Sequence, residues 1–197
     1  MVESRREANK RKSRQKILKA SRRLFKEKGY DNTMIEDVAD KAEVSKATLY
    51  NYFPNKESLL VGTMDDVSES FRKNVADMTD DLGIDEKIRR ALTYLIIDSI
   101  PFLDVSRRIL FLNATPNSAM FGKGNAVKEV FRTLVNQEKD EKIFSADITT
   151  EVIVDQLMGV YLISQFLWED LESMSEQDVR KKVDAAIDFA LAKCYVK

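Results

Sequence analysis

The chain has 197 residues, of which 44% are hydrophobic and 33% are charged, a composition typical of a folded protein rather than of a disordered tail. It contains no histidine and a single cysteine, which excludes a zinc site and a Ser-His or Cys-His catalytic arrangement. We therefore expect no metal and no cofactor, and no motif supplies the catalytic groups that an enzyme would need.

The net charge of −1 hides an uneven distribution along the chain. Residues 1–60 contain 15 Lys and Arg against 9 Asp and Glu, whereas residues 61–197 contain 17 against 24. The first third is therefore basic and the remainder acidic. This asymmetry predicts that the N-terminal part meets a polyanion while the rest of the chain has another role.

The sequence shows neither a typical secretory signal nor a segment that could span a membrane. The first residues are charged rather than apolar, which is not typical of a secretory signal. The longest apolar stretch, 152–168, is interrupted by Asp155, Gln156 and Gln165, so it is too short and too polar to span a bilayer. We expect a cytoplasmic protein with no membrane partner.

The first predicted helix covers residues 13–28, where Ile17, Ala20 and Leu24 recur at helical spacing and Gly29 stands where a cap belongs. The leading segment, 5–16, is rich in cations and lacks apolar residues that could pack. We interpret it either as a disordered arm that follows the DNA backbone or enters the minor groove, or as a solubilising tail.

A second, short helix is expected after Thr33, because Thr33 and Glu36 have the spacing of a capping box in which the threonine hydroxyl accepts from the backbone N–H of Glu36. A three-residue turn follows. Ser45 is a plausible N-cap for a third helix, which Pro54 must end. Three short helices connected in this way match the helix-turn-helix plan.

The third helix has a polar outer face. At 100° per residue, Leu49 and Phe53 share the inner face, while Ala47 and Asn51 lie opposite and Thr48 and Tyr50 lie on the flanks. Small and hydroxyl-bearing side chains suit the major groove of DNA, where Thr and Asn bond base edges and Tyr and Lys reach phosphates. A solvated helix face is the alternative.

The stretch "GYDNTMIEDVADKAEVSKATLYNYFPNKESLL" resembles the DNA-binding signature of the tetracycline-repressor (TetR) family of transcription regulators, and the close resemblance covers about residues 13–60. It implies an all-α homodimer with a three-helix DNA-binding domain, residues 1–60, followed by a larger helical domain, residues 61–197, for dimerisation and effector binding. A double-stranded DNA operator and a small molecule are the implied partners.

The resemblance also implies roles for single residues. It places Lys46 and Thr48 at or near bases, and Thr33, Tyr50, Tyr52 and Lys56 on phosphates. The family often has glycine where this chain has Ala47, whose methyl group would touch a thymine methyl or shift the helix outward. The full set of predicted DNA-binding residues is Thr33, Ser45, Lys46, Ala47, Thr48, Tyr50, Asn51, Tyr52 and Lys56.

The remaining pattern predicts longer helices at about 55–78, 86–100, 102–114, 126–142, 149–170 and 175–195. In the helix at 149–170 the apolar band, which includes Val152 and Leu167, is wider than one stripe, and the helix at 175–195 has a narrower stripe with small residues. Helices of this kind need a second partner surface, so we predict a homodimer through these two helices. Burial within one subunit is the alternative.

Aromatic and polar side chains in apolar surroundings are the candidates for an effector site, although side chains of this kind more often belong to the core. They are Tyr94, Asp98, Phe111, Asn113, Phe131, Gln156, Tyr161 and Trp168. Their aromatic character favours a mostly hydrophobic or planar ligand. The expected function is a repressor released from a palindromic operator by such a ligand; an architectural or unregulated DNA-binding protein is the alternative.

Overall fold

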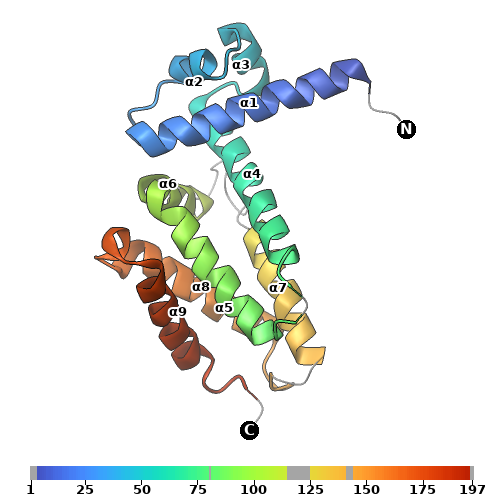
Figure 1. Ribbon diagram of the computed structural model, residues 1–197, viewed down its shortest axis with the longest axis vertical. Coiled ribbons are helices and arrows are strands. Elements are labelled where there is room, and N and C mark those ends of the chain that lie inside the picture. Colours follow the sequence, from blue (N-terminus) through green and yellow to red (C-terminus); the bar gives the residue numbers. More distant parts are fainter. Residues whose placement is uncertain (1–3, 80, 115–124, 141–143, 196–197) are drawn as a thin grey trace. The chain divides into compact units, whose positions relative to one another are not determined.

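The computed structural model describes residues 4–79, 81–114, 125–140 and 144–195 (Figure 1). Within these ranges the regular elements are helices, apart from one isolated β-bridge between Phe144 and Tyr195. The all-α prediction is confirmed. No described helix combines the length and the apolar character that a membrane crossing requires.

The chain forms two compact units, and two of the three points of division fall inside described helices. The first unit comprises Met1–Val67 and Arg108–Phe121, and the second comprises Ser68–Arg107 and Gly122–Lys197. Helix α4 (Lys56–Ala76) and helix α6 (Leu103–Ala114) each contribute residues to both units. At these two points the chain passes from one unit to the other within a helix.

The first unit is built from α1 (Arg5–Lys28), α2 (Ile35–Lys41), α3 (Lys46–Tyr52) and the beginning of α4. Burial of apolar side chains from each helix holds it together, since these side chains leave water on packing. The fully buried members are Ile17, Leu18, Phe25, Val38, Ala39, Leu49, Leu59 and Leu60. Gly29, with φ of 75°, ends α1 at the position predicted for a cap.

Helix α1 begins eight residues earlier than predicted. Ser4 and Glu7 form a capping box, in which the backbone N–H of Glu7 donates to the Ser4 hydroxyl and the backbone N–H of Ser4 donates to the Glu7 carboxylate. These bonds lower the pKa of the Glu7 carboxyl. Residues 5–16 are helical, so the expectation of a disordered arm is wrong.

The capping box predicted at Thr33 is also wrong. Thr33 is 2% exposed, and its hydroxyl donates to the carbonyl oxygens of Gly29 at 2.7 Å and Leu24 at 3.3 Å. The N-cap of α2 is Met34, which makes no side-chain cap. Burial explains the difference, because a buried hydroxyl must satisfy its own donor, and the end of α1 offers free carbonyls.

The side chains of Ser45 and Asn55 cap the N-termini of α3 and α4. The Ser45 hydroxyl accepts from the backbone N–H of Thr48 at 3.1 Å, as predicted, and α3 stops two residues before Pro54. The Asn55 side chain accepts from the backbone N–H of Ser58 at 2.7 Å and thereby caps α4. Gly62 of α4 leaves room for Phe53, because a Cβ there would lie 2.5 Å from the ring.

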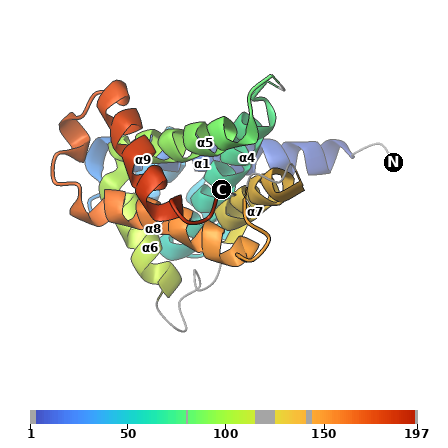
Figure 2. The ribbon, with the colours of Figure 1, turned by 90° about the horizontal axis from the view of Figure 1, so that it is seen from below.

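The second unit packs α5 (Ile84–Ser99), α7 (Asn125–Asp140), α8 (Thr150–Leu167) and α9 (Glu176–Leu191), together with the start of α6. Figure 2 shows α5 beside α9 and α7 beside α8. Short 3₁₀ helices at Ile100–Phe102 and Leu171–Ser173 turn the chain. The core is apolar and fully buried at Ile88, Leu92, Ile96, Phe131, Val135, Ile153, Val154, Leu157, Val179, Val183 and Ile187.

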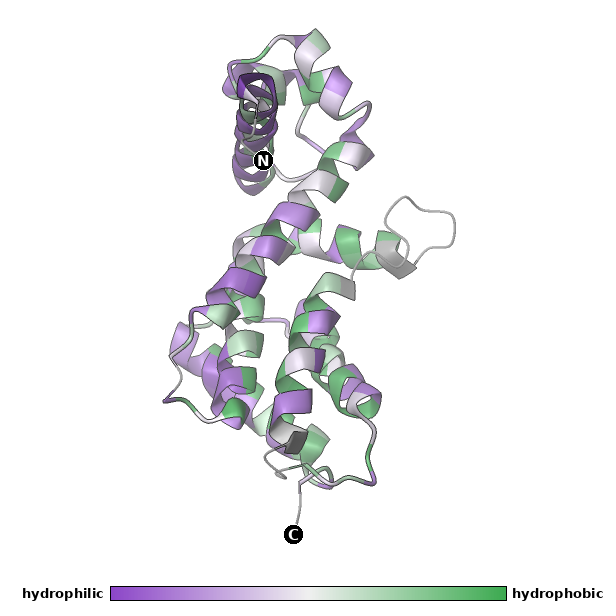
Figure 3. Ribbon diagram, turned by 90° about the vertical axis from the view of Figure 1, so that its right-hand side faces the viewer, coloured by the Kyte–Doolittle hydropathy of each residue, from purple (hydrophilic) through white to green (hydrophobic). Residues whose placement is uncertain are grey.

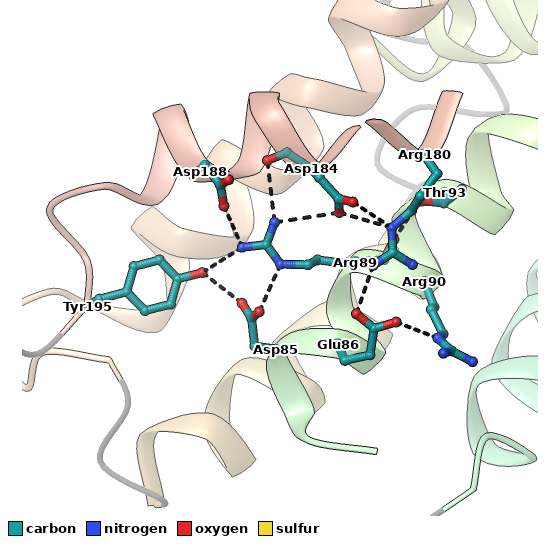
Figure 4. A network of polar contacts seen from close by, with 9 residues as sticks. All are labelled: Asp85, Glu86, Arg89, Arg90, Thr93, Arg180, Asp184, Asp188 and Tyr195. Carbon is teal, nitrogen blue, oxygen red and sulfur yellow. Dashed lines mark hydrogen bonds and ion pairs between the residues drawn. The ribbon is translucent and has the colours of Figure 1, made fainter. Parts of the chain in front are cut away.

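A network of ion pairs ties α5 to α9 (Figure 4). The Arg89 guanidinium, whose side chain is 13% exposed, donates to Asp85 at 2.8 Å and to Asp188 at 2.7 Å. Arg180 donates to Glu86 at 2.7 Å. The Tyr195 hydroxyl donates to Asp85, and burial together with this bond raises the pKa of that hydroxyl.

Candidate nucleic-acid interface and effector site

The outer face of α3 is polar and accessible, as its periodicity predicts. Leu49 and Phe53 are 0% and 4% exposed and pack inward. Lys46, Ala47 and Asn51 are exposed, and Thr48 is half-buried on the flank. A short helix with small side chains on its accessible face has the dimensions that a DNA major groove admits.

Two hydroxyls at the start of α3 bond to each other. The Ser45 and Thr48 side-chain oxygens are 2.8 Å apart, in addition to the cap that Ser45 provides. Because each hydroxyl has one proton and two lone pairs, the pair retains acceptor capacity toward a base or a water molecule. Ser45 therefore serves first as a structural cap.

Tyr50 is bonded to a carboxylate of the preceding helix. Its hydroxyl donates to Glu36 at 3.0 Å, and this bond raises the pKa of the Tyr50 hydroxyl. Glu36 belongs to α2, so the bond links the two helices of the helix-turn-helix. A phosphate oxygen that accepts a hydrogen bond from the Tyr50 hydroxyl must replace the Glu36 carboxylate as the acceptor.

Tyr52 and Lys56 make contacts within the first unit. The Tyr52 hydroxyl donates to the carbonyl oxygen of Lys10 at 3.1 Å. The Lys56 ammonium donates to the carbonyl oxygen of Asp31 at 3.1 Å and lies 4.3 Å from the ring centroid of Tyr30. Burial, with a smaller contribution from Arg108, lowers the pKa of Lys56.

The nine predicted DNA-binding residues therefore differ in exposure: Ser45 is exposed, and Thr48, Tyr52 and Lys56 are half-buried. Lys46, Ala47, Tyr50 and Asn51 are exposed on or beside α3. Thr33 lies in the core, and its hydroxyl is committed to carbonyl oxygens of the first unit.

The structure does not gather the eight predicted effector residues into one site. Phe131 is fully buried against Phe71, with ring centroids 5.9 Å apart, and is a core residue. Tyr94 stacks on the same Phe71 and is 37% exposed. Trp168 is buried with the Lys182 ammonium 4.7 Å from its ring centroid.

Three more of the eight are not part of a buried site in the second unit. Gln156 is exposed on α8, and Phe111 is 66% exposed in the part of α6 that belongs to the first unit. The side chain of Asn113 lies outside what the structure describes. Placing Gln156 inside an effector site was wrong, because α8 is apolar on both sides and its period alone does not say which glutamine faces inward.

Tyr161 and Asp98 are the predicted pair that comes together, in a polar cluster where the end of α5 and the start of α6 meet α8. Burial raises the pKa of Tyr161 to about 12, and its hydroxyl bonds with Ser99 and Ser106 while Asp98 acts on it through its charge. The cluster is defined here as Asp98, Ser99, Ser106, Arg107, Tyr161, Ser164 and Gln165.

Gln165 is the centre of this cluster, and the sequence reasoning did not select it. Its side chain is 0% exposed, and its Nε2 donates to Ser99 at 2.9 Å and to Ser164 at 3.2 Å. Its Oε1 has no hydrogen-bond partner among the described residues. The sequence signal that could have identified Gln165 was a glutamine that interrupts an apolar helix.

The orientation of the Gln165 amide follows from its neighbours. Ser99 donates its hydroxyl proton to the carbonyl of Ile96 at 2.6 Å, and Ser164 donates to the carbonyl of Tyr161 at 2.7 Å. Both hydroxyls can therefore only accept from the amide, so the NH₂ group must face them. The carbonyl Oε1 then points away as a buried acceptor, which costs about 1–3 kcal/mol unless a donor reaches it.

Comparison with known proteins gives a family match in the first unit. Residues 17–62 match the family described as bacterial regulatory proteins, tetR family. The HTH-type transcriptional regulator YuxN of Bacillus subtilis is 38% identical over 48 residues, 24% of this chain but only 16% of that protein. The HTH-type transcriptional repressor KstR of Rhodococcus jostii is 28% identical over 185 residues, 90% of this chain and 82% of KstR.

The fold of the whole chain also occurs in solved structures. FadR of Thermus thermophilus, a TetR family transcriptional repressor solved in complex with lauroyl-CoA, superposes with a TM-score of 0.71. The alignment covers 93% of this chain and 96% of FadR at 18% identity. At that identity the likeness shows the fold alone.

Proposed function

We propose that the chain is a member of the tetR family of bacterial regulatory proteins, whose family model matches residues 17–62, and that it is a cytoplasmic repressor, not an enzyme, that binds a palindromic DNA operator as a homodimer and is released by a small molecule. The observation that carries the proposal is the accessible polar face of α3, above the buried pair Leu49 and Phe53. An architectural DNA-binding protein without an effector remains the competing function.

The proposed base contacts come from Lys46, Ala47, Thr48 and Asn51, and the proposed phosphate contacts from Tyr50, Tyr52 and Lys56. Asn51 is exposed at the middle of the outer face, where its amide can bond a base edge. Tyr50 exchanges Glu36 for a phosphate oxygen, and Lys56 leaves the Asp31 carbonyl for the same purpose. We do not include Thr33 as a side-chain contact, because its hydroxyl is already bonded.

The DNA-binding part is tested by selecting bound duplexes from a randomised pool with the purified protein. We expect a palindrome to be enriched, and Lys46→Ala and Asn51→Ala each to lower affinity for it by roughly 10- to 100-fold, the loss of about 1–3 kcal/mol expected for a base contact. Lys26→Ala, an exposed lysine in the last turns of α1, is the matched control. Binding without any enriched sequence would instead support the architectural function.

The proposed dimer surface is the apolar side of α8 and α9 that the second unit leaves exposed. Its residues are Val152, Leu162, Ile163, Phe166, Leu167 and Phe189, which are between 43% and 88% exposed. An apolar surface of this kind, spread over two neighbouring helices, is typical of a protein–protein interface. A two-fold dimer through it places two recognition helices on successive half-sites of the operator.

Sedimentation equilibrium tests the dimer. Leu167→Glu and Phe189→Glu should convert a two-chain mass into a one-chain mass at micromolar concentration, because each buries a carboxylate in the apolar interface. Phe111→Glu, at a similarly exposed phenylalanine outside α8 and α9, should leave the mass unchanged. A one-chain mass for the unaltered protein would refute the dimer.

The proposed effector site is the polar cluster around Gln165. Its surroundings in α5 and α8 are apolar, and the free Oε1 is a buried acceptor. We therefore propose an effector that is mostly hydrophobic and carries one hydrogen-bond donor, such as a hydroxyl group. A ligand donor at Oε1 removes the cost of the unpaired acceptor, which favours the liganded arrangement of the helices.

Thermal shift with matched probes tests this chemistry. We expect 1-decanol to raise the melting temperature more than decyl methyl ether, because only the alcohol can donate to Oε1. In Gln165→Met the difference between the two probes should disappear, while Gln156→Met, at the exposed glutamine of the same helix, should retain it. Equal shifts by both probes in the unaltered protein would refute the proposed donor.

A further inference from the structure

The first twelve residues of α1, residues 5–16, are a helical extension that the match to the family model does not include. That match begins at residue 17, which is also the first buried position of α1. Figure 1 shows the N-terminal part of α1 continuing beyond α3, and Figure 3 colours these turns strongly hydrophilic. The extension therefore contributes no buried residue to the core.

The charge of the extension is one-sided. It contains seven cations and one acid, and the acid, Glu7, is occupied by the capping box with Ser4. Among the described residues, no ion pair involves the four cations Arg5, Arg6, Lys10 and Lys12. Like charges at helical spacing repel, so this helix keeps a repulsive arrangement that an external anion would relieve.

One side of α1 is apolar from Ile17 onward and cationic before it. At 100° per residue, Arg6, Lys10 and Arg14 lie on the same side as the buried residues Ile17 and Leu24. The apolar stripe thus continues toward the N-terminus as a row of cations. Arg5 and Lys12 lie on the opposite side of the helix.

Two contacts fix this stripe against the end of the recognition helix. The Tyr52 hydroxyl donates to the carbonyl of Lys10 at 3.1 Å, and the Arg14 guanidinium lies 5.6 Å from the ring centroid of Phe53. The row of cations therefore lies beside α3, on the side of α3 that contacts α1. A duplex held against the outer face of α3 would run past this row.

We propose that Arg6 and Lys10 form a preset phosphate-binding face that holds the DNA backbone beside the base pairs read by α3. The proposal rests on the proposed DNA-binding function. Twelve helical residues extend about 18 Å, which matches roughly five base-pair steps of a DNA strand. A membrane surface is a poorer fit, because residues 5–16 offer no apolar face that could enter the lipid.

The salt dependence of binding tests the proposal on the full-length protein and a duplex enriched from the randomised pool. R6Q/K10Q removes two cations from the proposed face, and R5Q/K12Q removes two exposed cations from the opposite face of the same turns. Glutamine retains helix propensity, and circular dichroism checks that both variants keep their helical content.

We expect R6Q/K10Q to reduce the slope of log K against log salt by about 2, since each phosphate contact contributes about 0.9, and R5Q/K12Q to reduce it by less than half as much. Equal reductions, or none, would overturn the oriented face while leaving sequence-specific binding intact. Failure to enrich any duplex would overturn the proposed function and this inference with it. If R6Q/K10Q loses binding to phosphatidylglycerol vesicles while its slope of log K for DNA against log salt is unchanged, the face binds membranes instead.

Discussion

Arg89→Met tests whether the ion-pair network of Figure 4 holds α5 against α9. Arg89 donates from α5 to Asp188 and to the carbonyl oxygen of Asp184 on α9, and to Asp85 within its own helix. Methionine retains most of the apolar stem and removes the charge. The substitution removes the cation that pairs with Asp85 and Asp188, while Asp184 keeps its ion pair with Arg180.

The expected loss follows from the burial of the partners. Removing one partner of a fully buried ion pair costs about 3–5 kcal/mol, whereas an exposed pair contributes about 0–1 kcal/mol. The Arg89 side chain is 13% exposed, but Asp85 and Asp188 are 37% and 67% exposed, so water screens part of the interaction. We therefore expect Arg89→Met to lower the free energy of unfolding by about 2 kcal/mol.

Urea unfolding followed by far-ultraviolet circular dichroism measures this loss at one fixed protein concentration. Arg90→Met is the matched control, because Arg90 is the next residue, is 51% exposed and pairs with Glu86 within α5. It should cost no more than about 0.5 kcal/mol. If the two variants lose the same amount, the network does not hold α9 to α5 and the reasoning is wrong.

Three further predictions concern local stability. Ser45→Ala should lower the free energy of unfolding by about 1 kcal/mol in urea titrations, because α3 loses the cap on the N–H of Thr48. Phe131→Ala should cost about 3–5 kcal/mol, as expected of a core residue, and a loss below 1 kcal/mol would return Phe131 to the effector candidates. The bond from Arg180 lowers the pKa of the Glu86 carboxyl, so its stabilisation is present above the unfolded pKa and is lost as pH falls through the folded one. Glu86→Gln should accordingly destabilise the protein by about 1 kcal/mol at pH 7 and by almost nothing near pH 3.

Local signals were enough to predict the recognition helix. Ser45 caps it, Pro54 limits it, and Leu49 and Phe53 select its inner face by their spacing. These signals act within one or two turns of the chain, so they do not depend on what packs against the helix. The same holds for Gly29, whose positive φ ends α1 as predicted.

Signals that depend on distant partners were misread. The Thr33 hydroxyl has the spacing of a cap, but it is buried and bonds to the end of α1 instead. Residues 5–16 lack an apolar face and were expected to be disordered or a tail, but the capping box at Ser4 and continuity with the packed part of α1 make them helical. In both cases a neighbouring element supplied what the local pattern lacked.

The sequence by itself determined that the chain is helical and that a basic helix-turn-helix precedes an acidic body, because cap residues, apolar periodicity and charge are local properties. Only the tertiary structure decided between Gln156 and Gln165. The two lie nine residues apart, on opposite sides of α8, and each has one polar and one apolar neighbour in the chain. Packing against Ser99 at the end of α5 buried Gln165 and left Gln156 in water, because burial depends on the helices that surround a residue and not on its own position in the chain.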